Sequence, residues 1–453
     1  MIIVQRLARI PSHLRLSAIT LAFTTLLLNS PTFALDYSLD LLLGSEVTDN
    51  VDRLGDNQKR EGIESYIGSD IGLTHDSEAL NFAANYHLMY RDFKNGTLKT
   101  NEEISGNSEL LWEILDSRLS WHINHDISEV LSNDLVADTV DNRETRQILS
   151  TGPTYTARIS GVDNIVLSLD YTQLSQGSAS NEGPADRSDI DSERAQADIV
   201  WSHSLSGTST LEVGYSNAET EFDNNSPDFN YQQLFAGYNT ELASGNYGIR
   251  LGANRAERNL MDADQTGVFT AINYNRNFSG NIFSVDIVRQ LADSSMGLES
   301  DIDSLNTNNF DEIAVVERTR LDVAYEFQNL CRGCIAQLTY TYDNSDFEND
   351  ELVLLTDSTQ DNKDNRISAN LTYNINSRLS TRLLTSYLQT DFSDFNRKDR
   401  ITEVESQTDW QLSAKLTLNF SLSYVNRDTK NSPLGDIDYD ASTVGISANY
   451  TIK

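Results

Sequence analysis

The amino-acid sequence predicts an all-β fold, namely a transmembrane antiparallel β-barrel of about 20 strands. Three observations predict it. Apolar and polar residues alternate with a period of two from residue 35 to the end, the connections are alternately short and long, and no later apolar run approaches the roughly 18 residues that a membrane-spanning helix needs. A period of two gives each strand one apolar and one polar face, so we expect the first to contact lipid and the second to line a lumen.

Composition and charge exclude several other classes of protein. The net charge is −34, from 34 basic and 68 acidic side chains, and phosphate repels such a chain, so we expect no nucleic-acid partner. Two cysteines cannot build a disulfide scaffold. The 19 Tyr and 16 Phe are too many for a disordered acidic chain.

Residues 1–34 have the features of a secretory signal peptide. Arg6, Arg9 and Arg15 form a positive segment, Leu16 to Leu28 is apolar, and Ala34 supplies a small residue before the expected cleavage site. A membrane anchor would use the same residues, but the apolar run is short for that role. We therefore expect a signal peptide at 1–34, a barrel at 35–453, and a location in the cell outer membrane.

The alternation continues along the whole remaining chain. Representative segments are Leu80 to Tyr90, Ile165 to Tyr171 and Leu416 to Tyr424. Short turns alternate with long polar connections, which is typical of barrels with periplasmic turns and external loops. A soluble β-propeller is the alternative, but its blades bury both sheet faces, whereas here one face is consistently polar.

Aromatic residues mark the two expected membrane interfaces. Trp112, Trp121, Trp201 and Trp410 all lie on the apolar face, at the short-turn end of their strands, where an indole ring prefers the interface. A second girdle is expected near the other end. Its tyrosines would be Tyr90, Tyr171, Tyr231, Tyr342, Tyr387 and Tyr424.

Several short motifs resemble a known family. They are Thr48-Asp49-Asn50-Val51, Leu111-Trp112-Glu113, Arg118-Leu119-Ser120-Trp121 and Thr151-Gly152-Pro153. Together they resemble the outer-membrane β-barrel family associated with exosortase (PEP-CTERM) and exopolysaccharide systems, which is related to the β-barrel porins. The resemblance covers essentially the whole chain after residue 34. It implies an outer-membrane barrel with a part in the export of surface polymers, and it carries over no catalytic residue.

No motif for enzyme chemistry is found. The sequence lacks G-x-S-x-G, H-E-x-x-H, P-loop and G-x-G-x-x-G patterns. His87 and His122 would face the lumen, whereas His125, three residues after His122, would face the opposite side of the sheet. We expect no enzymatic activity, no cofactor and no metal site.

Cys331 and Cys334 are expected to form a disulfide in a turn. A redox motif or half of a zinc site would use the same C-x-x-C spacing, but neither a helix nor a second cysteine pair accompanies it. An oxidising periplasm favours the disulfide.

Charged residues also fall in the inward register, where they would set the electric field of a pore or form a bracing lattice of ion pairs. We expect these pore-lining residues to include Arg250, Arg318, Arg320, Arg366, Arg378, Arg382, Glu109, Glu113, Asp322 and Glu326.

The function expected from the sequence is a porin-like channel, which would be a conduit or accessory for an exopolysaccharide or other surface polymer. The alternative is a structural or surface-interaction barrel with an occluded lumen, whose acidic loops bind divalent cations or lipopolysaccharide. The acidic stretch from Asp343 to Glu351 is one such loop. The expected partners are outer-membrane lipid and lipopolysaccharide, divalent cations, and a polysaccharide.

Overall fold

The computed structural model describes residues 35–95, 98, 100–131, 136–177, 190–222, 228–258, 263–293, 315–328, 330–347, 361–393, 396–432 and 437–453. The predicted signal peptide, residues 1–34, lies outside this range. Over the described residues, no helix is long and apolar enough to cross a membrane.

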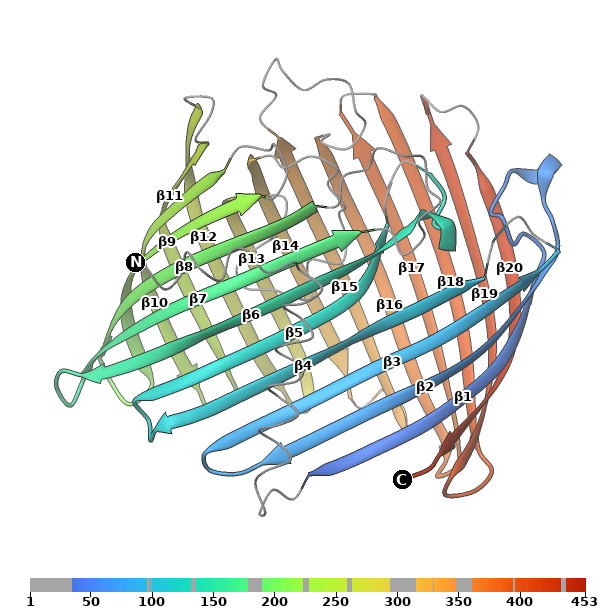
Figure 1. Ribbon diagram of the computed structural model, residues 1–453, viewed down its shortest axis with the longest axis horizontal. Coiled ribbons are helices and arrows are strands. Elements are labelled where there is room, and N and C mark those ends of the chain that lie inside the picture. Colours follow the sequence, from blue (N-terminus) through green and yellow to red (C-terminus); the bar gives the residue numbers. More distant parts are fainter. Residues whose placement is uncertain are drawn as a thin grey trace, which may run out of the picture.

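The molecule is a closed antiparallel barrel of 20 strands, which confirms the predicted fold class and strand number (Figure 1). Every strand pairs with the next along the chain, and two 3-10 turns, η2 and η3, lie in connections at the long-loop end. The elements are β1 (Asp36–Thr48), η2 (Asp56–Gln58), β2 (Gly62–Asp76), β3 (Leu80–Lys94), β4 (Asn101–Leu115), β5 (Leu119–Leu131), η3 (Val140–Asn142), β6 (Arg143–Arg158), β7 (Asp163–Gly177), β8 (Ile190–Ser204), β9 (Ser209–Phe222), β10 (Phe229–Leu242), β11 (Gly245–Arg258), β12 (Ala263–Phe278), β13 (Asn281–Asp293), β14 (Val315–Phe327), β15 (Cys334–Phe347), β16 (Asn362–Asn376), β17 (Leu379–Phe392), β18 (Arg397–Gln411), β19 (Leu416–Lys430) and β20 (Tyr439–Thr451).

Pairing between β1 and β20 closes the sheet. Their register runs from Asp40 opposite Thr451 to Thr48 opposite Thr443. Beyond the last strand, the backbone N–H of Ile452 donates to the carbonyl of Leu39 at 2.8 Å. Closure leaves no open sheet edge, so the backbone polar groups of the wall are satisfied without water.

Two residues of the first motif fasten the outer end of this seam. The carboxylate of Asp49 accepts a hydrogen bond from the backbone N–H of Ser442 at 2.7 Å. The buried side chain of Asn50 donates to the carbonyl of Asp440 at 2.8 Å and accepts from the N–H of Leu54 at 3.0 Å. The β1–β2 connection is therefore held against β20.

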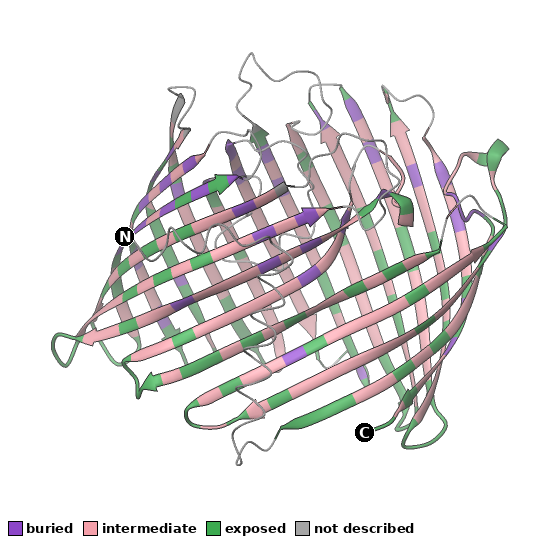
Figure 2. Ribbon diagram, viewed as in Figure 1, coloured by how far each residue is buried: buried purple, intermediate pink, exposed green. Residues whose placement is uncertain are grey.

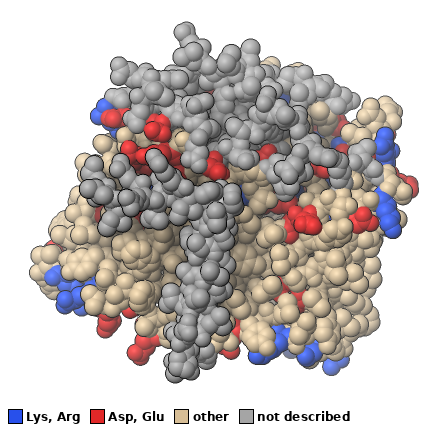
Figure 3. Space-filling model, in the orientation of Figure 1, with Lys and Arg blue, Asp and Glu red and all other residues tan. Residues whose placement is uncertain are grey.

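The period of two produces a lipid-facing belt around the wall. On β1 the outward side chains include Leu41 and Leu43, which are 46% and 63% exposed although both are leucines. Exposed and less exposed residues alternate along the strands in Figure 2, and buried residues gather toward the long-loop end. Figure 3 shows a broad band poor in charge, with charged groups mainly above and below it. Such a band is the surface that a bilayer covers.

The four tryptophans lie on the outside of the barrel near the short turns. Trp112 and Trp121 are cross-strand neighbours on β4 and β5, and the indole N–H of Trp121 donates to the hydroxyl of Thr151 at 2.8 Å. Trp201 and Trp410 occupy the corresponding ends of β8 and β18. All four side chains are between 38% and 50% exposed, as an interfacial girdle requires.

The predicted second girdle is wrong at Tyr231. This residue of β10 is 6% exposed and points into the barrel, where its hydroxyl donates to Gln233 and lies 3.3 Å from the side-chain amide of Asn254. Near the outer end of β10 the aromatic residues lie on the inward face, since Phe229 is also inward and buried, while the outward Asn230 and Gln232 are polar. Periodicity alone assigns such a strand to the wrong side.

Gly152 and Pro153 make a close contact between β6 and β7. A Cβ built on Gly152 would lie 1.7 Å from the carbonyl oxygen of Leu169. Pro153, which has no N–H to donate, lies beside it where bridging to β7 is interrupted, between Thr151 and Thr154. The Thr-Gly-Pro motif is thus a site of close strand approach.

We expect Gly152→Val to lower the free energy of unfolding by about 1–3 kcal/mol, because the new side chain overpacks the β6–β7 contact. Denaturant titration of the barrel refolded into liposomes would measure the change. Gly161→Val is the matched control, since nothing lies within 4 Å of a Cβ at that turn position. Equal stability of the two variants would contradict the role assigned to Gly152.

Candidate lumen and outer mouth

The lumen side of the wall is identified by a segment that crosses the barrel. Residues 136–142, here called the crossing segment, connect β5 to β6, yet the guanidinium of Arg427 on β19 donates to the carbonyl of Val136. Because β19 and β5 are separated by β20 and β1 to β4 around the wall, the crossing segment spans the interior (Figure 1). Arg427 and the side chains in its register therefore face the lumen.

Two ion pairs of Asp138 hold the crossing segment. Asp138 accepts from the Nε of Arg143 at 2.9 Å and pairs with Arg53 of the β1–β2 connection at 3.5 Å. Burial opposes ionisation of Asp138, but these two guanidinium groups outweigh it and hold the pKa of the carboxyl below its ordinary value of 3.8. The segment is therefore anchored by charge at neutral pH.

A buried cluster on β18 and β19 supports the Arg427 anchor. Asp399 accepts from Arg397 at 2.7 Å and from Arg427 at 2.6 Å, and all three side chains are at most 4% exposed. The carbonyl of Val136 accepts a further hydrogen bond from Arg427 of this cluster.

Beside the crossing segment lies an acid-rich cavity of about 390 Å³, here called the mouth cavity. Arg91 of β3, one of three arginines that line it with Arg53 and Arg143, is paired with Glu64 and Glu103, the latter at 2.7 Å. The cavity's remaining lining residues include more carboxylates than cationic side chains. The acidic residues from the strands around it are Glu46, Glu64, Glu103, Glu129, Glu403 and Glu405.

The short-turn half of the barrel holds a larger cavity of about 1220 Å³, here called the vestibule. Glycine, alanine, asparagine and threonine contribute much of its wall. Charged side chains meet there in pairs: Arg250 with Glu212 at 3.2 Å, and Arg320 with Asp322 at 2.6 Å. This volume is large enough for a small hydrated solute.

The pore-lining residues predicted from the sequence fall mainly in the lumenal register. Nine of the ten lie on inward positions of β4, β11, β14, β16 and β17, whereas Arg378 lies in the β16–β17 turn at the periplasmic edge. The inward nine are Glu109, Glu113, Arg250, Arg318, Arg320, Asp322, Glu326, Arg366 and Arg382.

Neighbouring carboxylates engage several of these arginines. Arg318 is buried and makes a two-pronged pair with Asp343, its Nε lying 2.9 Å from Oδ1. Arg382 lies 3.6 Å from Glu405 and donates to Gln407. Asp343 had been assigned from the sequence to an acidic loop, but it is a wall residue of β15. Periodicity placed the arginines, and only the cross-strand register shows which acid each one meets.

Part of the lumen is apolar, which the alternation did not predict. Near the long-loop end of β9 to β14, buried apolar side chains form an interior cluster whose members are Ala218, Phe222, Phe229, Tyr231, Ala256, Leu291 and Val315. The outer half of the barrel is thus narrowed by packing as well as by the crossing segment.

The lumenal histidines are each paired with an aspartate. His87 Nδ1 lies 2.5 Å from Asp70, and His122 Nε2 lies 2.7 Å from Asp170. His125 lies on the outer face and contacts the hydroxyl of Tyr86 at 2.7 Å. Among the described residues, no group of three or more His, Cys, Asp and Glu has the arrangement needed to bind a metal ion.

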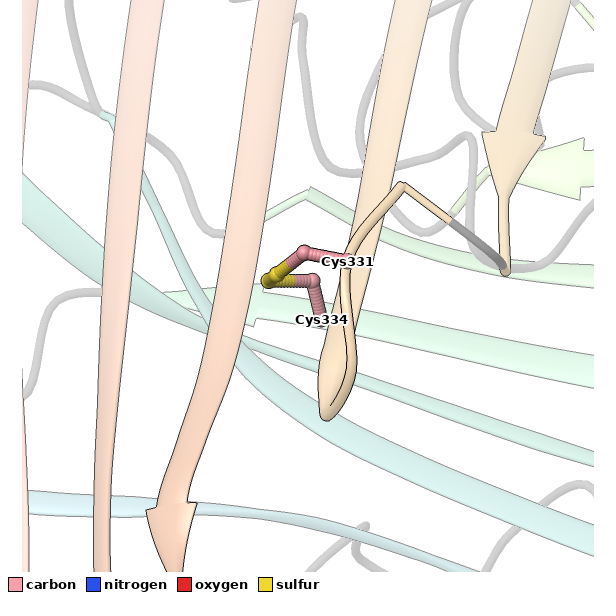
Figure 4. Close-up of a disulfide and its surroundings, with 2 residues drawn as sticks. All are labelled: Cys331 and Cys334. Atoms are coloured by element: carbon pink, nitrogen blue, oxygen red, sulfur yellow. A yellow bond between two sulfur atoms is a disulfide. The ribbon is translucent and has the colours of Figure 1, made fainter.

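Cys331 and Cys334 form a disulfide that ties the β14–β15 turn (Figure 4). The backbone N–H of Cys334 donates to the carbonyl of Cys331 at 3.1 Å, and Gly333 between them has a φ of +83° that favours glycine. This disulfide cross-links the two ends of the turn between β14 and β15.

A closed antiparallel barrel with an apolar belt, an indole girdle and a charged lumen defines an outer-membrane β-barrel. In sequence, residues 357–451 match the family model described as "Putative beta-barrel porin 2". This stretch contains β16 to β20, so the match covers the last five strands of the wall. No curated protein matches the chain.

Solved structures of outer-membrane proteins align with most of this chain at low sequence identity. The FrpB iron transporter from Neisseria meningitidis aligns over 92% of this chain and 83% of its own, with a TM-score of 0.51 and 8% identity. The siderophore receptor PirA from Pseudomonas aeruginosa aligns over 93% and 81%, with a TM-score of 0.45 and 12% identity. An OmpT loop-deletion mutant from Vibrio cholerae aligns over 92% and 99%, with a TM-score of 0.34 and 14% identity.

We expect Arg318→Gln to cost about 3–5 kcal/mol of unfolding free energy, because it leaves the Asp343 carboxylate buried without its partner. Arg250→Gln, at a pair whose arginine is 46% exposed, should cost at most about 1 kcal/mol. Parallel denaturant titrations would measure both. Similar costs for the two variants would show that Arg318 is not a bracing residue.

Proposed function

We propose that this barrel is a porin-like channel that passes small polar solutes and favours cations. The observation that carries the proposal is the mouth cavity, whose described lining has seven carboxylates, from β1, β2, β4, β5, β18 and the crossing segment, against the three arginines Arg53, Arg91 and Arg143. Excess negative charge in a constriction with low-dielectric walls attracts cations and repels anions. The vestibule behind it provides the wider part of the path.

Selectivity for cations is directly measurable. In a planar bilayer with a KCl gradient, the reversal potential should have the sign of a K⁺-selective pore. The double variant Glu403→Gln/Glu405→Gln should bring it closer to zero, because it removes two mouth carboxylates. Asp428→Asn, on the outer face of β19, is the control and should leave the reversal potential unchanged. An anion-selective or unselective wild-type pore would refute the proposal.

The crossing segment should limit conductance, and Asp138 provides a test. Asp138→Asn removes the carboxylate that Arg53 and Arg143 hold, so single-channel conductance should rise at neutral pH. Since the pKa of Asp138 is lowered in the folded protein, its contacts persist above the ordinary value of 3.8 and are lost as pH falls below it. Wild-type conductance should therefore be steady from about pH 7 to 5 and rise in stronger acid.

The Asp138→Asn variant should lack that acid-dependent rise in conductance. An equal rise in the variant and the wild type would assign the acid response to other lumenal carboxylates and would contradict the anchoring role of Asp138.

Export of an exopolysaccharide or another surface polymer is a narrower form of the proposal, which rests on the family resemblance alone. A polymer chain needs a continuous path, so it would require the crossing segment to leave the lumen.

A second candidate is a structural barrel with an occluded lumen, whose acidic loops bind divalent cations. The interior apolar cluster and the crossing segment favour it. Absence of conductance in the wild type, in Asp138→Asn and in a variant lacking residues 136–142 would support this alternative.

A further inference from the structure

The outer rim of β16 to β19 carries a row of basic side chains on the outside of the barrel. The register places Lys363 opposite Asp391, Asp391 opposite Lys398, and Lys398 opposite Lys430. One lateral row therefore crosses four strands with three lysines and one carboxylate. Arg400, the next outward residue after Lys398 on β18, adds a fourth cation.

The row lies immediately beyond the lipid-facing belt. Its residues share the outward register of Ile367, Tyr387, Val404 and Tyr424, which are 38–51% exposed. Lys363 is four residues beyond Ile367, or about 13 Å along the strand, and less along the membrane normal because the strands tilt. Lysine side chains can also bend back toward the interface. The basic row is thus at the level of lipid headgroups.

Within the part of the chain that the structure describes, ion pairs do not match every cation of the row. Lys398 pairs with Asp391 at 2.8 Å. Arg400 lies 3.8 Å from Asp428, and the side chains of Arg400 and Asp428 are each more than a third exposed. Lys363 lies over the ring of Tyr342 at 5.2 Å. Lys430 is exposed and makes no ion pair with any part of the chain that the structure describes. Two lysines directly opposite each other repel unless an anion lies between them.

The row itself is rich in cations although the whole chain carries −34. Of its members Lys363, Lys398, Arg400 and Lys430, the second and third form ion pairs with two carboxylates, those of Asp391 and Asp428. The outward rim on the other side of the barrel is acidic, for example at Glu193 of β8 and at Glu219 and Glu221 of β9. An anion in the membrane plane is therefore attracted to the rim of β16–β19 and repelled by the rim of β8 and β9.

We propose that the rim formed by Lys363, Lys398, Arg400 and Lys430 binds the phosphate groups of lipopolysaccharide in the outer leaflet, through its phosphorylated glucosamine headgroup. Primary ammonium groups and a guanidinium are the donors that phosphate oxygens accept, and a rigid sheet spaces them without loss of loop entropy. The acyl chains of the same lipid would lie on the belt below, against Ile367 and Val404. This contact is direct and does not need a bridging divalent cation.

The test compares lipid binding by two variants of the full barrel. The triple variant Lys363→Gln/Lys398→Gln/Lys430→Gln removes the row, and Arg255→Gln/Arg289→Gln removes two outward rim arginines that are paired with Glu257 and Glu317. Affinity for bisphosphorylated lipid A would be measured in nanodiscs of zwitterionic lipid, with EDTA present. The triple variant should bind at least about tenfold more weakly than the wild type, and the arginine control should bind as the wild type does.

Two further ligands identify the source of the phosphate. Lipid A without phosphates should bind the wild type as weakly as the triple variant binds the phosphorylated form, and millimolar inorganic phosphate should not displace the phosphorylated lipid. Equal binding by wild type and triple variant would overturn the proposal, as would undiminished binding of dephosphorylated lipid A. Displacement by inorganic phosphate would show a site for a free anion rather than for a lipid. Heat-modified mobility on electrophoresis checks that each variant is folded.

Discussion

The structure depends on one constraint, that a bilayer offers the backbone no hydrogen-bond partners. The pairing of β1 with β20 meets this constraint, since it converts a sheet with two open edges into a wall with none. The seam is secured at both ends, by Ile452 on Leu39 near the short turns and by Asp49 and Asn50 against β20 at the outer end. A barrel closed in this way can bring charged side chains together inside while presenting hydrocarbon outside.

Within the closed wall, charge is used in two ways. Buried pairs such as Arg318 with Asp343, and the Arg397–Asp399–Arg427 cluster, fasten neighbouring strands and give the crossing segment a fixed end. Elsewhere the acids outnumber the cations that could neutralise them, as in the mouth cavity. The buried pairs stabilise the barrel wall, and the excess carboxylates make the electrostatic potential of the mouth cavity negative.

Alternation, connection lengths and the tryptophan positions were sufficient to predict the barrel, its 20 strands and the lipid-facing side of most of them, because each depends on residues close in sequence. Contacts that depend on register could not be predicted in the same way. Neither the partner of Arg318 nor the lysine row follows from the spacing within one strand. Tyr231 was misassigned because the outer end of β10 reverses the usual pattern, with aromatic residues inward and polar residues outward. The crossing segment was missed because nothing in residues 136–142 signals a contact with β19.

The acid-rich mouth also affects the chemistry of the water inside it. Protons are cations, and each 1 kT of negative potential raises their local concentration about threefold. Water held beside Glu46, Glu403 and Glu405 is therefore more acidic than the surrounding medium. A basic group placed in this cavity would hold a proton more readily than in bulk solution, and a weak acid would give up its proton less readily.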